Sequence, residues 1–224
     1  MANVRKIKRR EYSLGANGKK LPSVTEIMGR HLGWKTQGLC GYYYARGKAG
    51  EPMQAHRDAA GARGSCTHAI VAAGLGGDPV DQSEWRTSQI DEATPNAQRV
   101  VDDIKRRGWE VLYIEEALEC SRFAGTVDLC VRDADGSVRI CDLKTSRGIY
   151  AETVIQLGAY AWLHRLRGDH GIPVSGAVIH APFGEPLRVV DVPAPALFAG
   201  EQAFRHLLDL HEIEHAVALG EVLS

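Results

Sequence analysis

Hydrophobic and polar positions follow two different periods along this chain, and the change falls near Gly108. After Gly108 come short stretches rich in β-branched and aromatic residues, separated by glycine, proline and aspartate. These stretches predict five strands, with one helix between the third and the fourth and another helix after the fifth. The predicted strands cover residues 109–120, 123–132, 137–145, 174–183 and 186–193, and the two helices cover 150–167 and 195–219.

The half of the chain before Gly108 is predicted to be mainly helical. A helix should begin after Ser23, because Ser23 and Glu26 have the spacing of a capping box. Residues 35–50 contain four glycines, which favours a loop that runs into further helix. An alanine-rich helix is expected over about 53–73, and another over 94–107. The order of helices and strands therefore predicts an α/β fold with a helical N-terminal half packed on it.

Length and charge divide the chain unevenly. Its 224 residues suffice for one well-buried core, so residues 21–224 are expected to form a single domain. Residues 1–20 hold seven basic side chains and one acidic one, although the whole chain has a net charge of −1. A basic arm beside an acidic body fits a phosphate-binding segment next to a metal-binding pocket. A solvated terminus or, with weaker support, a mitochondrial transit peptide would account for the same charges.

Membrane insertion and disulfide bonding are both disfavoured by the sequence. The chain contains no run of about 18 apolar residues and does not begin with a secretory signal. Its five cysteines form no C-x-x-C pair, which fits reduced, mostly buried thiols of a cytoplasmic protein.

Charged residues interrupt the two central predicted strands. Asp142 and Lys144 lie two apart in one strand, so they share a face with the apolar residues that precede them. A three-residue turn with Gly136 in the left-handed conformation would place Asp128 opposite Asp142. A two-residue turn at Asp135 and Gly136 would instead send Asp128 to the other face of the hairpin.

In the first register the two carboxylates would destabilise the sheet, because facing Cβ atoms lie about 5 Å apart. Either one carboxyl is protonated or a cation lies between them. Lys144 neutralises one charge only, so a hard divalent cation with oxygen ligands resolves the conflict more fully. An exposed ladder of ion pairs on an edge strand is the simpler alternative, because the D-x-K pattern by itself is common.

Two further features are consistent with a site. Gln156 and Tyr160 lie four apart in a predicted helix and therefore on one of its faces, although such a pair often marks a half-buried polar edge. His68 follows Gly64 in the alanine-rich helix, where a lone histidine is more often a satisfied core residue than a ligand.

Several segments together resemble the RecB-type branch of the PD-(D/E)XK nucleases. The strongest are FAGTVDL, ICDLKTS and QLGAYAWL, which carry the aspartate, the D-x-K motif and the Q-x-x-x-Y motif. Upstream, LPSVTEIM, RGSCTHAI and IEEAL are similar to motifs of the mitochondrial genome maintenance exonucleases and their bacterial and phage relatives. Val127 stands where the superfamily's name has proline, a departure that this branch commonly tolerates.

The resemblance covers about residues 21–164 and implies a restriction-endonuclease-like core. Such a core is a central mixed sheet flanked by helices, here with a helical N-terminal half. The implied parts are a basic arm (1–20), a helical part (21–107), the nuclease core (108–194) and a C-terminal helix (195–224).

The resemblance also implies roles for individual residues. The implied ligands of Mg²⁺ or Mn²⁺ are His68, Asp128, Asp142 and the backbone carbonyl of Leu143. Lys144 would orient or activate the attacking water, while Gln156 and Tyr160 would position the lysine or the phosphate. Glu115 is expected as the catalytic glutamate of its strand, with Glu116 as the alternative. No iron–sulfur cluster is expected, because the iron–sulfur relatives use a late group of three cysteines and this chain has none after Cys141.

These expectations predict a metal-dependent DNA nuclease, and the resemblance adds exonuclease action on single-stranded or free-ended DNA. The side chains expected to contact DNA are all basic: Arg9, Arg10, Lys105, Arg106, Arg107 and Arg147. The predicted setting is the cytoplasm of a bacterial or phage-infected cell, without a membrane partner. Two alternatives stay open: a catalytically silent module that binds DNA or a protein, and a structural divalent-ion site in an unrelated α/β protein.

Overall fold

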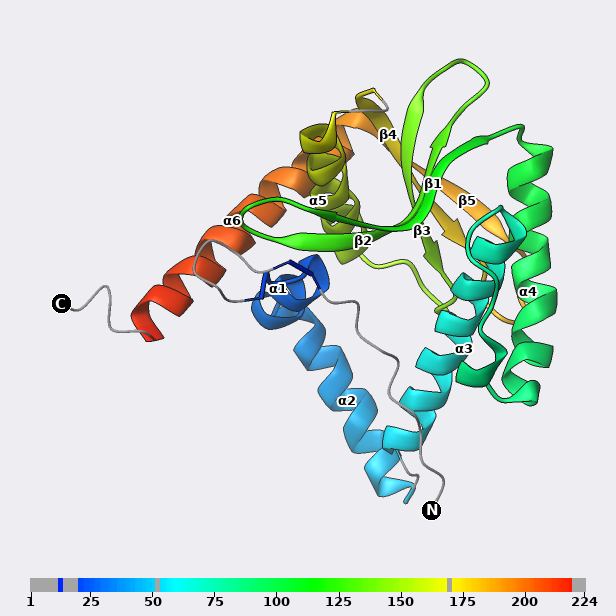
Figure 1. Ribbon diagram of the computed structural model, residues 1–224. Coiled ribbons are helices and arrows are strands. Elements are labelled where there is room, and N and C mark those ends of the chain that lie inside the picture. The colour runs from blue at the N-terminus through cyan, green and yellow to red at the C-terminus, as the bar shows by residue number, and fades with distance from the viewer. Residues whose placement is uncertain (1–11, 14–19, 51–52, 169–170, 219–224) are drawn as a thin grey trace.

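The computed structural model describes residues 12–13, 20–50, 53–168 and 171–218. At its centre is a five-stranded sheet in which the strands follow chain order from β1 to β5 (Figure 1). Strands β3 and β4 are parallel, and the other neighbouring pairs are antiparallel. The parallel pair requires a crossover, which helix α5 provides. The strands are β1 (Glu110–Glu119), β2 (Ala124–Arg132), β3 (Val138–Lys144), β4 (Pro173–His180) and β5 (Arg188–Pro193).

Helices cover both faces of the sheet. Helices α5 and α6 lie on one face, while α3 and α4 lie on the other (Figure 1). Helix α1 lies beside α6, and α2 leads away from it. The first face is packed around Phe123, Leu157 and Phe204, and the second around Ile104 and Ile179. The helices are α1 (Val24–His31), α2 (Trp34–Lys48), α3 (Met53–Gly74), α4 (Thr87–Arg106), α5 (Glu152–Arg167) and α6 (Ala194–Ala218), with a 3₁₀ turn at Gln82–Glu84.

This arrangement confirms the predicted α/β fold with a central mixed sheet flanked by helices. Each predicted strand is present, with bounds that differ from the expected ones by at most three residues. Ser23 caps α1 as predicted, because its Oγ accepts a hydrogen bond from the backbone N–H of Glu26 at 3.1 Å. Within the described residues, no helix combines the length and apolar character needed to cross a membrane.

The turn between β2 and β3 is the predicted three-residue turn. Gly136 has a φ of 84°, and the Asp133 N–H donates to the Ser137 carbonyl at 2.8 Å. Leu129 consequently pairs with Cys141, which is the first of the two registers considered. Continuing this register by one residue brings Asp128 beside Asp142.

Two helices differ from expectation. The predicted loop within 35–50 is helix α2 instead, since a glycine inside a helix costs only about 1 kcal/mol and does not by itself break it. Of the four glycines, Gly50 is the one just beyond the helix C-cap, with a φ of 67°. Helix α4 begins at Thr87 rather than Thr94, because Pro95 lies inside the helix and does not start it.

The cysteines behave as free thiols. All five lack a disulfide partner, and Cys66, Cys130 and Cys141 are buried. Burial raises the pKa of Cys66 and of Cys141, so both thiols stay protonated at neutral pH. Burial is thus found for three of the five cysteines, while Cys40 is exposed and Cys120 is half-buried.

Candidate active site

Side chains from three different elements meet beside the end of β3. His68 comes from α3, Glu115 from β1 and Asp128 from β2, and their ligand atoms lie within 4.8 Å of one another. His68 Nδ1 is 3.1 Å from Glu115 Oε1 and 3.6 Å from Asp128 Oδ1. His68 Nε2 is 3.0 Å from the carbonyl oxygen of Leu143. Both ring nitrogens therefore face oxygen atoms, as those of a doubly protonated imidazole or a metal ligand would.

Asp128 is held where the β2–β3 ladder ends. The ladder stops at the pair of Leu129 and Cys141. Beyond it, the Leu143 N–H donates to Asp128 Oδ2 at 2.8 Å instead of to a backbone carbonyl. This bond fixes the carboxylate and leaves its Oδ1 on the side of His68.

A second group of side chains runs from β3 to α5. Lys144 Nζ donates to Asp142 Oδ1 at 2.9 Å and to Gln156 Oε1 at 3.2 Å. Gln156 Nε2 donates in turn to the Tyr160 hydroxyl at 3.0 Å. The predicted D-x-K and Q-x-x-x-Y residues therefore form one continuous chain of hydrogen bonds, which orients the lysine.

The backbone aims Glu115 at this site. Its neighbours Ile114 and Glu116 pair with Leu129 and Val127, so Glu115 lies opposite Asp128. Glu115 has a φ of 47°, an uncommon value for a residue other than glycine and one that concentrates at functional sites. Glu116 points elsewhere and forms a 2.6 Å ion pair with Arg167. Of the two candidate glutamates, Glu115 is therefore the one in contact with His68.

Two glycines allow close approach at the site. A Cβ on Gly125 would lie 2.6 Å from Cε1 of Tyr160, and one on Gly64 would lie 3.0 Å from Oγ1 of Thr145. Gly125 lets α5 approach the strand that carries Asp128, and Gly64 lets α3 approach the end of β3. No role for Gly125 by itself was predicted from the sequence, although a glycine inside a predicted strand is a known signal of close backbone approach.

Burial and neighbouring charges have opposite effects on the pKa values of the residues in this site. Burial raises the pKa of Asp128 to about 7, with Asp142 adding to the rise and His68 opposing it. Burial alone would lower the pKa of His68, but Asp128 and Glu115 outweigh it and raise that pKa to about 9. Burial likewise opposes the charge on Lys144, yet Asp142 keeps the pKa of Lys144 above its usual value. The site thus concentrates negative charge in a partly dehydrated setting.

The donors fit a hard divalent ion. Carboxylate and carbonyl oxygens with one imidazole suit Mg²⁺ or Mn²⁺. Asp142 is fully buried, and its Oδ2 accepts no hydrogen bond from the described residues, although Lys144 Nζ lies at an ion-pair distance of 2.9 Å. A small cavity next to these groups is lined by His68, Glu115 and Asp128 and by apolar residues of α3, α4 and strands β1 to β4. Lys144 offsets one negative charge only, so the several buried acids of the site favour a further cation nearby.

The residues predicted to contact DNA are scattered. Arg147 is exposed in the loop that follows β3, close in sequence to Lys144. Arg106 and Arg107 both pair with the buried Asp103 at the end of α4, next to the exposed Lys105. Arg9 and Arg10 lie outside the described residues. A role for any of the six in DNA binding stays a prediction.

Comparison with known proteins identifies the family. A family model described as the PD-(D/E)XK nuclease superfamily matches residues 44–216, which is most of the chain. The chain belongs to the PD-(D/E)XK nuclease superfamily. Nucleases of this superfamily act on nucleic acids and generally use divalent metal ions, in agreement with the donors found at this site.

The other comparisons give no relationship more specific than this superfamily. No curated protein sequence matches the chain. Among solved structures, one described as "Crystal structure of SSO0001" has 13% sequence identity and a TM-score of 0.34. That match covers 56% of this chain and 64% of the other, and at this distance it adds nothing to the family assignment.

Proposed function

We propose that this PD-(D/E)XK protein is a Mg²⁺- or Mn²⁺-dependent deoxyribonuclease of the RecB-type branch. We further propose exonuclease action on single-stranded or free-ended DNA, as in the mitochondrial genome maintenance exonucleases that the sequence resembles. The observation that carries the proposal is the convergence of His68, Glu115 and Asp128 beside the ion pair of Asp142 and Lys144.

Hydrolysis of a phosphodiester adds negative charge to a centre that is already anionic. When bound, a divalent ion supplies positive charge at the phosphoryl oxygen and lowers the pKa of water. The residues that would hold it are His68, Asp128, Asp142 and the carbonyl of Leu143. Glu115 contacts His68 and would keep its imidazole oriented, as outer-shell carboxylates do around many metal sites.

Lys144 supplies the second fixed positive charge. Its raised pKa keeps the ammonium group protonated at neutral pH. Asp142 and Gln156 hold Nζ from two sides, so the lysine is positioned before substrate arrives. In this proposal Lys144 orients the attacking water and offsets the charge that grows on the phosphate. Tyr160 acts through Gln156 as a positioning residue.

The helical part offers a path for a DNA strand. Helices α2 and α3 form a V that projects away from the sheet, and α3 carries His68 (Figure 1). Tyr44 on α2 is 70% exposed and could stack on a base. We propose that this V guides single-stranded DNA, with the basic arm and Arg147 contacting phosphates.

The test is cleavage of end-labelled single- and double-stranded DNA in Mg²⁺ or Mn²⁺, beside EDTA. We expect shortening that requires metal and is lost in Lys144→Ala. Lys105→Ala is the matched control, because Lys105 is exposed at the end of α4; it should keep kcat even if DNA binding weakens at high salt. Circular single-stranded DNA should stay intact if the enzyme needs an end.

Three outcomes would contradict parts of this proposal. Full cleavage by Lys144→Ala would exclude the mechanism, and cleavage of circular DNA would exclude strict exonuclease action. Metal and DNA binding without any cleavage would favour the silent binding module instead.

A further inference from the structure

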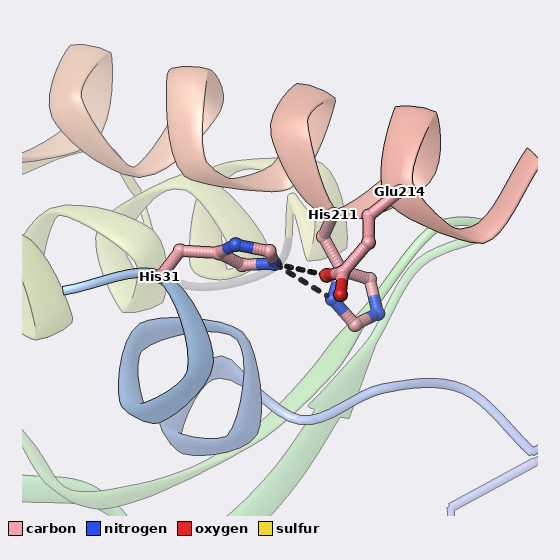
Figure 2. Close-up of side chains that lie close together, drawn as sticks. All are labelled: His31, His211 and Glu214. Carbon is pink, nitrogen blue, oxygen red and sulfur yellow. Dashed lines mark hydrogen bonds and ion pairs between the residues drawn. The ribbon is translucent and has the colours of Figure 1, made fainter. Parts of the chain in front are cut away.

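A second cluster of metal-binding side chains lies between α1 and α6, which are distant in sequence. His31 is the last residue of α1, and His211 and Glu214 are one turn apart on α6 (Figure 2). His31 Nε2 is 3.2 Å from His211 Nδ1 and 3.5 Å from Glu214 Oε2. Ligand atoms of all three residues lie within 4.8 Å of one another.

These distances match the spacing of ligands around one tetrahedral ion. Zinc bonds of about 2.0–2.1 Å at tetrahedral angles place neighbouring donor atoms about 3.4 Å apart. The two separations from His31 Nε2 fall on either side of that value. Little rearrangement is therefore needed for both imidazoles and the carboxylate to bind one ion.

The two imidazoles of the cluster are shielded from water, whereas Glu214 is partly exposed. His211 is 3% exposed, and the side chain of His31 is 7% exposed.

Arg30 holds the carboxylate in place. Its Nε donates to Glu214 Oε2 at 2.7 Å and its Nη2 to Oε1 at 2.6 Å. Ligating carboxylates are usually hydrogen-bonded by an outer partner of this kind, which fixes their orientation. Glu214 is therefore positioned on α6 rather than free to rotate.

Residues 211–215 read HEIEH, the H-E-x-x-H pattern of zinc-binding helices. In that pattern the glutamate after the first histidine serves as a general base. Here that residue, Glu212, is instead bound by Arg122 Nε and Nη2 at 2.8 and 2.7 Å. The geometry therefore favours a structural ion over a hydrolytic one. His215 is exposed, and its ring lies 4.7 Å from that of His211, within range to serve as a fourth ligand.

We propose that His31, His211 and Glu214 bind Zn²⁺ or a similar borderline transition-metal ion, which fastens α1 to α6. The donor set has two nitrogens and one carboxylate, a combination typical of zinc rather than of Mg²⁺. The site is separate from the nuclease site, which is built on α3, α5 and strands β1 to β3. Because α1 begins next to β2, through the bond from Ala124 N–H to the Pro22 carbonyl, the ion would also steady this side of the sheet.

The test is a Zn²⁺ titration of the full chain in competition with a chromophoric chelator, followed by thermal unfolding with Zn²⁺ or EDTA. We expect one tight site in the wild type, weakened at least about tenfold in Glu214→Gln and in His31→Gln. The tight site should persist in His68→Gln, which alters the nuclease site. Glu212→Gln is the matched control, because Glu212 is also on α6 but faces Arg122.

Thermal unfolding separates loss of metal from loss of fold. Glu214 is 41% exposed, so Glu214→Gln should fold, and Zn²⁺ should raise Tm in the wild type and in Glu212→Gln but not in Glu214→Gln. Unchanged zinc affinity in both Glu214→Gln and His31→Gln would overturn the proposal. Loss of the tight site in His68→Gln would assign that site to the nuclease centre and would also overturn it.

Discussion

Two histidine–carboxylate clusters in the described part of the chain differ in their donor atoms. The cluster beside the sheet is rich in oxygen, since Glu115, Asp128 and Asp142 accompany a single imidazole. The cluster between α1 and α6 is rich in nitrogen, with two imidazoles and one carboxylate. Hard ions prefer oxygen donors, whereas imidazole suits zinc, so the two clusters should select different ions.

The two clusters also differ in how the charge of their carboxylates is balanced in the absence of metal. Glu214 is paired with Arg30 through two hydrogen bonds, and its pKa is lowered accordingly. At the sheet, burial raises the pKa of Asp128 and of Asp142 although the nearby charges of His68 and Lys144 oppose the rise. A buried acid whose charged form stays disfavoured despite its partners favours a bound cation and points to a reactive site, whereas an acid fully paired with arginine is consistent with a structural contact.

The largest expected effect is at Asp128. Asp128→Asn keeps the shape of the side chain but removes a charged ligand, so metal-dependent cleavage should fall at least about 100-fold, or about 3 kcal/mol. Zinc affinity at the α1–α6 cluster should stay unchanged. Cleavage rates and the zinc titration on the same preparation check both expectations. Loss of the tight zinc site in this variant would show that the two clusters are not independent.

The β2–β3 hairpin was predictable because its signals are local. The turn residues ending in Gly136 fix the register, and the register fixes Asp128 beside Asp142. The convergence of Lys144 with Gln156, in contrast, was anticipated through the family resemblance, since spacing alone says nothing about how α5 docks on the sheet.

Other features depend on contacts between distant parts of the chain. The positive φ of Glu115 leaves no mark in the sequence. His31 and His211 are 180 residues apart, so no spacing rule connects them. The HEIEH segment is a sequence signal of a metal site on α6. However, its second glutamate, Glu214, contacts His31, whereas the pattern assigns the functional role to the first. Helix α2 was missed because glycine content is weak evidence against a helix.

The second-largest loss of cleavage is expected at Glu115, whose side chain points away from that of its neighbour Glu116. Glu115→Gln removes the charge that orients His68, so cleavage should fall about 10- to 100-fold. Glu116→Gln is the matched change, since Glu116 binds Arg167 and should leave cleavage nearly unaffected. Steady-state rates at saturating Mg²⁺ or Mn²⁺ measure both. Equal losses in the two variants, or a larger one in Glu116→Gln, would contradict the assignment of Glu115.

The smallest effect on cleavage is expected at Gly125, where the nuclease site touches α1. A Cβ there would lie 2.6 Å from the Tyr160 ring and 3.1 Å from Cγ2 of Val24. Gly125→Ala should therefore lower stability by about 1–3 kcal/mol through overpacking, and should reduce cleavage less than the two changes above.

Gly29→Ala is the matched control on α1, because a Cβ at Gly29 meets no described atom within 4 Å. It should raise stability by about 0.4–1 kcal/mol, since alanine favours the helix. Denaturant unfolding with and without Zn²⁺ compares the two variants. If Gly125→Ala weakens zinc binding as well as cleavage, α1 transmits strain from the Tyr160 side of the nuclease site to His31. If zinc affinity is unchanged, the displacement of α1 is confined to the region of Val24, and the two clusters work independently.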